Sequence, residues 1–234
     1  MHMSCRWGDI LTDSKGGEMP IEFIKTETTD SPVTVYNFQV EDYHTYYVSD
    51  TGLLVHNAKY PNEDLKVGSE DIKAIRDKHG LSDTNTVAVG KTDVPGLEKI
   101  TFEGGSPKVR NEIGMPDLDI EMPNRAIKAP GDNPLFTRHA EEVIANKFDI
   151  AVQKAGLSPQ DVNGTLRIHQ SNPSGVCKKC IQGLTNDSVK PGILKQLSQK
   201  YPELIIKITS ETDSSIKVTG RLEIIIKNGR YLGE

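Results

Sequence analysis

One histidine, one glutamate and two cysteines, in two short motifs, are the residues best suited to chemistry. The motifs are His139-Ala140-Glu141 and Cys177-Lys178-Lys179-Cys180. One imidazole nitrogen and two thiolates suit a catalytic zinc ion, because such an ion keeps its fourth position for water. Glu141 would not be a ligand; its carboxylate would carry a proton from the metal-bound water to a leaving amine. The four residues predict a catalytic zinc site.

Two helix starts have to position these motifs. An apolar stripe predicts a helix over 135–154, which places His139 in its first turn. A second helix is predicted over 177–184, and cysteines at i and i+3 of its N-terminus can reach one metal ion from one face. There the helix dipole also favours thiolate. A strand predicted over 165–169 lies between the helices in the sequence and can bring both helix starts together.

The surrounding pattern is that of a mixed α/β domain. Further strands are predicted over 86–89, 99–102, 204–208 and 222–226, and another helix over 192–201. A proline-containing stretch over 105–134 is predicted to be a long loop. The segment 209–220 offers a turn and no crossover helix, so the last two strands should pair antiparallel.

Composition and charge limit the function classes. A chain of 234 residues holds one to two domains of about 150 residues each. Three cysteines exclude a disulfide-rich scaffold, and no apolar run approaches the roughly 18 residues of a membrane span. The net charge of −5 hides an asymmetry, because 136–234 carries 14 Lys and Arg against 10 Asp and Glu. This basic part is where a polyanion could bind.

Candidate substrate contacts flank the two motifs. The polar and basic candidates are Arg138, His169, Asn172, Ser174, Lys178 and Lys179. The basic ones could meet phosphate or simply form a solvated surface. The rings of Phe136, Tyr201 and His169 could stack on a base or pack in the core, and core packing is the expectation for Phe136.

Other interpretations of the same residues exist. A redox pair of the thioredoxin type would explain the two cysteines but not His139 and Glu141. A structural zinc would need a fourth protein ligand, for which His169 is the nearby candidate. His139 could also be a core histidine, and Glu141 could be one of two solvated carboxylates with Glu142.

The order H-x-E and then C-x-x-C resembles the signature of the zinc-dependent nucleobase deaminases. Pro173 is not adjacent to the first cysteine, and the form N-P-x-G-x-C-x-x-C over 172–180 is similar to bacterial polymorphic-toxin deaminases, in particular the double-stranded DNA cytosine deaminase toxins. The resemblance implies a deaminase domain over 81–234. It also implies a three-layer α/β/α cytidine-deaminase-like fold with a five-stranded mixed sheet, whose last two strands are antiparallel.

A second resemblance covers 1–58, where short strands are expected around 34–40, 44–48 and 53–55. The segment is similar to the C-terminal part of a Hint (intein-like) pretoxin domain and ends in His56-Asn57-Ala58. The resemblance implies that His56 assists while Asn57 cyclises and breaks the bond before Ala58. The upstream half with its nucleophile is absent, so cleavage is not expected in this chain. Residues 59–80 are expected to be a linker with one weak helical stretch over 69–76.

Together the two resemblances imply a secreted toxin that acts in the cytoplasm of a target cell. The predicted activity is conversion of cytosine to uracil in single- or double-stranded DNA with Zn²⁺ as cofactor. RNA or a free nucleotide is the alternative substrate, and a non-catalytic, zinc-stabilised binding module is the alternative class. The toxin layout also implies a cognate immunity protein, and the basic surface suggests that this partner is acidic. No membrane partner is expected.

Overall fold

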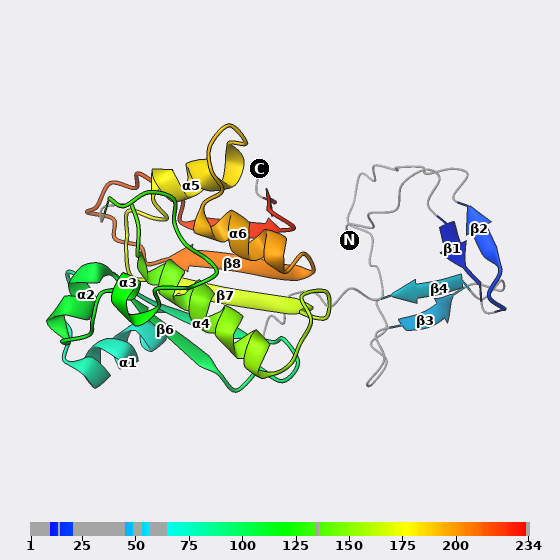
Figure 1. Ribbon diagram of the computed structural model, residues 1–234, viewed down its shortest axis with the longest axis horizontal. Coiled ribbons are helices and arrows are strands. Elements are labelled where there is room, and N and C mark those ends of the chain that lie inside the picture. The colour runs from blue at the N-terminus through cyan, green and yellow to red at the C-terminus, as the bar shows by residue number, and fades with distance from the viewer. Residues whose placement is uncertain are drawn as a thin grey trace. The chain divides into compact units, whose positions relative to one another are not determined.

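The computed structural model describes residues 10–13, 15–20, 45–48, 53–56, 65–133 and 136–232. The chain divides into two compact units, Met1–Lys59 and Tyr60–Glu234 (Figure 1). In the described part of the first unit, β1 (Ile10–Thr12) pairs antiparallel with β2 (Glu18–Pro20), and β3 (Thr45–Val48) pairs antiparallel with β4 (Leu53–His56). The strand expected over 34–40 and the residue Asn57 lie outside the described residues, whereas His56 is the last residue of β4.

A six-stranded mixed sheet forms the centre of the second unit. Its strands are β5 (Val87–Thr92), β6 (Thr101–Gly105), β7 (Gly164–Gln170), β8 (Leu204–Ser210), β9 (Glu223–Lys227) and β10 (Arg230–Tyr231). The strand order is β10-β9-β8-β7-β5-β6. β7 and β8 run parallel, and the other neighbouring pairs are antiparallel. The antiparallel pairing predicted for the strands over 204–208 and 222–226 is confirmed.

The expected number of five strands is wrong, because a short hairpin adds β10 at one edge. Lys227 pairs with Arg230 across a two-residue turn formed by Asn228 and Gly229. Both turn residues have positive φ, 47° and 69°, as a tight hairpin turn matched to the strand twist requires. The Asn-Gly pair is a strong sequence signal for such a hairpin, so β10 could have been predicted from the sequence.

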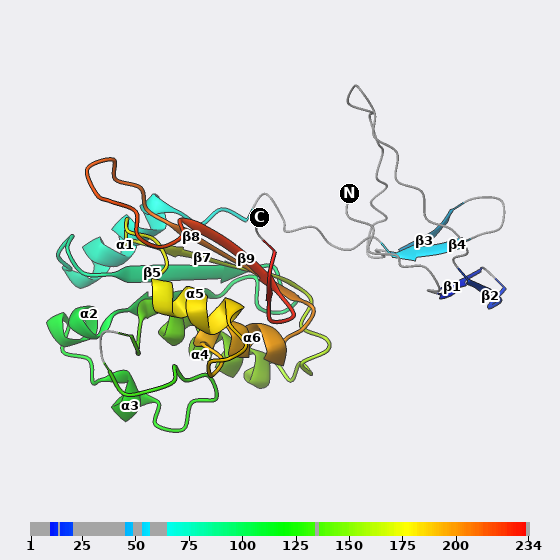
Figure 2. The same ribbon diagram turned by 90° about the horizontal axis from the view of Figure 1, so that it is seen from above.

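Helices cover both faces of this sheet. They are α1 (Ser69–His79), α2 (Pro107–Glu112), α3 (Leu118–Glu121), α4 (Ala140–Lys154), α5 (Lys178–Thr185) and α6 (Ile193–Lys200). Figure 2 shows α1 on one side of the sheet and α4, α5 and α6 on the other. The alternation of β5 explains this arrangement: Ala88 joins the core on the α4 side, whereas Val87 and Val89 pack with Ile72 and Ile75 of α1.

Two segments are more structured than the sequence indicated. Residues 69–79 of the expected linker form α1, whose buried Ile72 and Ile75 pack on the sheet within the second unit. The long loop over 105–134 contains α2 and α3. Ser106 caps α2 by accepting a hydrogen bond from the amide of Val109, with Pro107 at the first helical position, and Asp117 caps α3.

Candidate metal centre

The two motifs stand at the N-termini of α4 and α5, on either side of β7 in the sequence. His139 is the N-cap residue of α4, one position before the first turn, and Cys177 is the N-cap residue of α5. The helix predicted to begin at 135 begins at Ala140, because Arg138 adopts a left-handed conformation with φ of 60° that a helix cannot contain.

The sheet brings the three expected metal ligands together. The ligand atoms of His139, Cys177 and Cys180 all lie within 4.8 Å of one another. The two Sγ atoms are 3.2 Å apart, and the Sγ atom of Cys180 lies 3.8 Å from Nδ1 of His139. This His-Cys-Cys group could hold a metal ion.

The two thiols are electrostatically unequal. The hydrogen bond between them lowers the pKa of Cys177 and raises the pKa of Cys180. Burial adds to the raised pKa of Cys180 and opposes the lowered pKa of Cys177, which His139 lowers as well. One thiolate is therefore stabilised before any cation is present, and a metal ion would be needed to stabilise the second.

The neighbouring glutamates are both buried, so the alternative of two solvated carboxylates is wrong. Glu141 is 5% exposed and Glu142 is 1% exposed. Burial raises the pKa of Glu141, against the opposing charge of His139, and Cys177 raises it further. Glu142 instead forms an ion pair with Arg125 at 2.8 Å. The two carboxylates therefore face different surroundings.

A glycine seats the start of α4 directly on the edge strand β6. A Cβ atom added to Gly104 would lie 2.2 Å from the carbonyl oxygen of Ala140. Only a residue without a side chain allows this approach of backbone to backbone. This contact fixes how close the N-terminus of α4, with His139 and Glu141, lies to the sheet.

The loop before Cys177 is shaped by Asn172 and Ser174. Oδ1 of Asn172 accepts a hydrogen bond from the amide of Ser174, and its Nδ2 donates to the carbonyl of Gly175. The carbonyl of Ser174 accepts from the amides of Thr219 and Gly220. These contacts give both residues a structural task in holding the loop that carries the first cysteine.

The remaining candidate contacts divide into paired and exposed residues. Nη1 of Arg138 lies 2.7 Å from Oδ2 of Asp119, so its charge is already used within the protein. Lys178 and Lys179 are exposed, and Lys179 also lines a pocket beside the metal ligands. The two lysines keep their place as candidate phosphate contacts.

His169 does not belong to the metal centre. Across β5 and β7 it pairs with Val89, whose side chain faces α1, so the alternation of the strand puts His169 on that face as well. Its Nδ1 lies 2.8 Å from Oγ1 of Thr209, and its Nε2 lies 3.4 Å from a carboxylate oxygen of Glu211. His169 as a fourth zinc ligand or as a base-stacking group is therefore wrong.

A pocket of about 430 Å³ opens beside His139 and Cys180. Its wall includes Phe136, which is 44% exposed, so the expectation that this ring packs in the core is wrong. The ring of Tyr201 is 1% exposed, and its hydroxyl donates to Asp149. Of the two rings, only Phe136 can meet a ligand.

Comparison with known proteins gives a family match that lies in the first unit. Residues 3–58 match the family model of the pretoxin HINT domain. No curated protein and no solved structure matches the chain significantly. The pretoxin domain indicates a secreted polymorphic toxin.

The described helices are short, the longest in the second unit being the 15-residue α4. Within the part of the chain that the structure describes, none is long and apolar enough to cross a membrane.

Proposed function

We propose that the second unit is a zinc-dependent toxin deaminase that converts cytosine to uracil in DNA. The observation that carries the proposal is the His-Cys-Cys group at two helix starts, with the buried Glu141 two residues after the histidine. The proposal includes a cytidine-deaminase-like fold, in which β10 is an addition to the five longer strands.

The donor set fits zinc. One imidazole and two thiolates are borderline and soft ligands, and three protein ligands are the number that a catalytic zinc ion takes. His139, Cys177 and Cys180 would hold the ion. When bound, zinc lowers the pKa of a coordinated water to about 7 and so supplies a nucleophile at neutral pH.

Glu141 would handle the protons of the reaction. Its carboxylate is buried and within electrostatic range of His139 and Cys177. Conversion of cytosine to uracil moves both protons of the attacking water: one goes to N3 of the ring, and the other goes to the amino nitrogen, which leaves as ammonia. A carboxylate close to these atoms could take up each proton from the oxygen and deliver it in turn.

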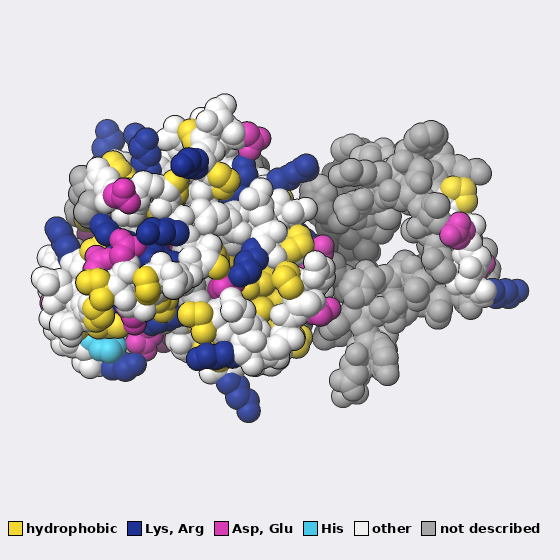
Figure 3. Space-filling view, viewed as in Figure 1, with side chains coloured by type: hydrophobic (Ala, Val, Ile, Leu, Met, Phe, Trp, Pro, Cys, Tyr) yellow, Lys and Arg dark blue, Asp and Glu magenta, His cyan; other side chains and the backbone are white. Residues whose placement is uncertain are grey.

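The pocket and the nearby charges support a nucleic-acid substrate. A base that leaves its stack could enter the 430 Å³ pocket, where the exposed ring of Phe136 offers a stacking surface. Lys and Arg side chains gather around α5 in Figure 3, and Lys178 and Lys179 of this helix are exposed. A free nucleotide would need no such basic surface.

The pretoxin domain supports the biological part of the proposal. A secreted toxin that deaminates DNA would act in the cytoplasm of a target cell, and its producer would need an antidote. We propose an acidic immunity protein that covers the pocket beside His139 and Cys180. Such a partner would compete with DNA, and added salt would weaken its binding.

One assay tests the proposal. The chain is incubated with single- and double-stranded DNA and RNA and with free cytidine nucleotides, and ammonia release is measured together with uracil-glycosylase-dependent cleavage of the DNA. We expect zinc-dependent activity on DNA. Release from RNA or nucleotides alone would contradict the DNA substrate, and zinc binding without release from any substrate would support a non-catalytic module.

The variant Glu141→Gln tests the role of the carboxylate. It should reduce turnover by about 10²–10⁴-fold while zinc remains bound, because the side chain handles protons and is not a ligand. The control is Glu203→Gln, since Glu203 pairs with Lys227 on an exposed part of the surface away from α3 and α4. Near-wild-type turnover of Glu141→Gln would show that the mechanism is wrong.

A further inference from the structure

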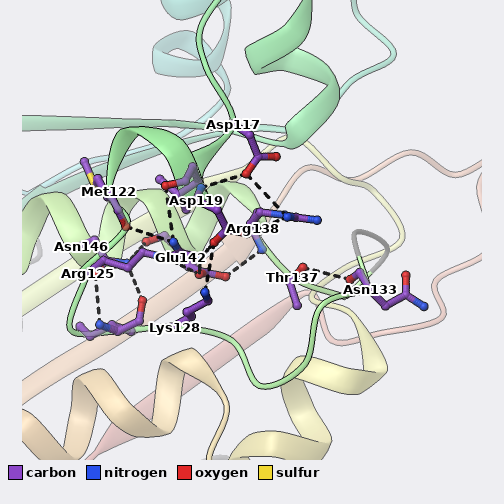
Figure 4. A network of polar contacts seen from close by, with 12 residues as sticks. Asp117, Asp119, Met122, Arg125, Lys128, Asn133, Thr137, Arg138, Glu142 and Asn146 are labelled. Carbon is purple, nitrogen blue, oxygen red and sulfur yellow. Dashed lines mark hydrogen bonds and ion pairs between the residues drawn. The ribbon is translucent and has the colours of Figure 1, made fainter.

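Glu142 uses both of its carboxylate oxygens inside the protein (Figure 4). Oε1 accepts a hydrogen bond from Nε of Arg125 at 2.8 Å, and Oε2 accepts one from the backbone amide of Arg138 at 2.8 Å. The side chains of Glu142 and Arg125 are each 1% exposed. Removing either partner of this buried ion pair would leave the other charge buried without compensation, which strongly destabilises a fold.

The contact to the backbone of Arg138 acts on the residue that directly precedes the metal ligand His139. Arg138 has φ of 60°, a left-handed conformation that is strained for a residue with a side chain. It persists only where the surroundings hold it, and here they do so at two points. Glu142 binds the amide, and Asp119 binds the guanidinium at 2.7 Å.

The same network ties α3 to α4. Arg125 forms a second ion pair with Asp119 at 2.7 Å, and its Nη1 donates to the carbonyls of Leu118 and Met122. One turn further along α4, Asn146 exchanges two hydrogen bonds with the backbone of Ile127. The segment from α3 to 127 is therefore fastened along the first two turns of α4.

We propose that Glu142, through Arg125 and the backbone of Arg138, is a positioning residue of the metal centre. It fixes the turn at 138 and so directs His139 towards Cys177 and Cys180, and Glu141 towards the same space. The inference rests on the proposed function for its consequence in catalysis, but its test also has a readout independent of activity.

The test uses Glu142→Gln and measures Zn²⁺ affinity by competition with a chromophoric chelator. In parallel, the visible spectrum of bound Co²⁺ reports the ligand geometry. We expect the variant to bind Zn²⁺ about 10- to 100-fold more weakly, with an altered Co²⁺ spectrum, as is usual when a residue that orients a ligand is lost. The matched control is again Glu203→Gln, which breaks an ion pair with Lys227 away from α3 and α4.

A rescue experiment separates positioning from general stabilisation. Glycine adopts a left-handed conformation without steric cost. If Glu142 acts by holding the turn at 138, then Glu142→Gln combined with Arg138→Gly should recover part of the metal affinity. The free energy of unfolding is measured in the same variants, and a role limited to overall stability predicts no recovery of affinity beyond the recovery of that free energy. If Glu142→Gln does not fold, Asp119→Asn replaces it in the test. Asp119 holds the same turn through the guanidinium of Arg138, and its side chain is more exposed, so its loss disturbs the fold less.

The outcomes separate the two proposals. Unchanged Zn²⁺ affinity and an unchanged Co²⁺ spectrum in Glu142→Gln, or in Asp119→Asn if the first variant does not fold, would overturn the positioning role even if the wild type deaminates DNA. Weakened metal binding in a chain that deaminates no substrate would support the positioning role and overturn the proposed function. A wild-type chain that binds no metal would overturn both.

Discussion

The two helices that meet at the metal centre differ in how firmly the protein holds them. Ten residues of α4 are buried, and they include four polar or charged side chains, Glu141, Glu142, Asn146 and Asp149. In α5 only Gly183 and Leu184 are buried. His139 thus stands on a helix fixed by the sheet and by a charged network, whereas both cysteines stand on a helix with little burial of its own.

This difference predicts that the protein's own contacts order α4, whereas a bound ion would help to order α5. If the group holds an ion, His139 would be oriented before the ion arrives, because α4 and the turn at Arg138 are already held by the contacts of Glu142 and Asp119. The ligands on α5 depend on the loop over 172–176 and on each other. A bound ion would therefore contribute more to the order of α5 than to that of α4.

The largest expected effect follows from Cys177→Ser. The variant should lose the metal ion, and with free zinc at about 100 times its dissociation constant this removes about 2.7 kcal/mol of stabilisation. Metal analysis and thermal unfolding of the purified protein measure both losses. Hydrogen exchange should accelerate in α5 and much less in α4, and a chelator added to the wild type should reproduce this. Equal acceleration in both helices would contradict the comparison.

Substitution of one glycine at each helix tests how tightly α4 and α5 pack. The expected changes in the free energy of unfolding are smaller on average than for Cys177→Ser. Gly104→Ala places a methyl group against the carbonyl of Ala140, and overpacking of this kind typically costs about 1–3 kcal/mol. Gly183→Ala in α5 meets Gly192 at 2.8 Å, but alanine gains up to about 1 kcal/mol of helix propensity. We expect the Gly104 variant to be the less stable one in urea unfolding. The reverse order would show that α5 is the more tightly packed helix.

The smallest expected effect concerns Asp119, which joins α3 to the network on α4. Burial acts to raise its pKa, but the contacts with Arg125, Arg138 and Lys128 prevail and lower it to about 2. The carboxylate therefore stabilises the fold above about pH 4, and this contribution is lost as the pH falls towards 2.

Asp119→Asn should cost less than about 1 kcal/mol at pH 7, because the side chain is 37% exposed and solvent screens the pair. Near pH 2 the variant and the wild type should unfold alike. Urea titrations at the two pH values measure the difference. An equal loss of stability at both would show that charge is not the cause.

The sequence predicted the elements whose signals are local. The motif spacings indicated the His-Cys-Cys group, and the short turn-forming segment over 209–220 indicated the antiparallel β8–β9 pair. The helix α5 begins within one residue of its expected start. Periodicity and capping residues act over a few positions, so they can be recognised without knowledge of the fold.

The contacts that support the centre could not be predicted in this way. That Arg125 would reach Glu142 and not solvent depends on how α3 folds back along α4. The exposure of Phe136 depends on how the segment before α4 lies against the domain. The placement of His169 on the far face of the sheet depends on the register and direction of β7, which no local pattern determines. The hairpin at Asn228-Gly229 is different, since its signal was present in the sequence.

The order of the strands also affects how the chain folds. Ile168 in the central strand β7 pairs with Gly90 on one side and with Ile208 on the other, so both pairings join residues far apart in the sequence. Domains dominated by such non-local pairings fold in milliseconds to seconds, because loop closure precedes the gain from contacts. His139 lies within the loop closed by β5 and β7, and Cys177 follows β7. The three residues therefore come together only when the pairing of β5 with β7 has formed.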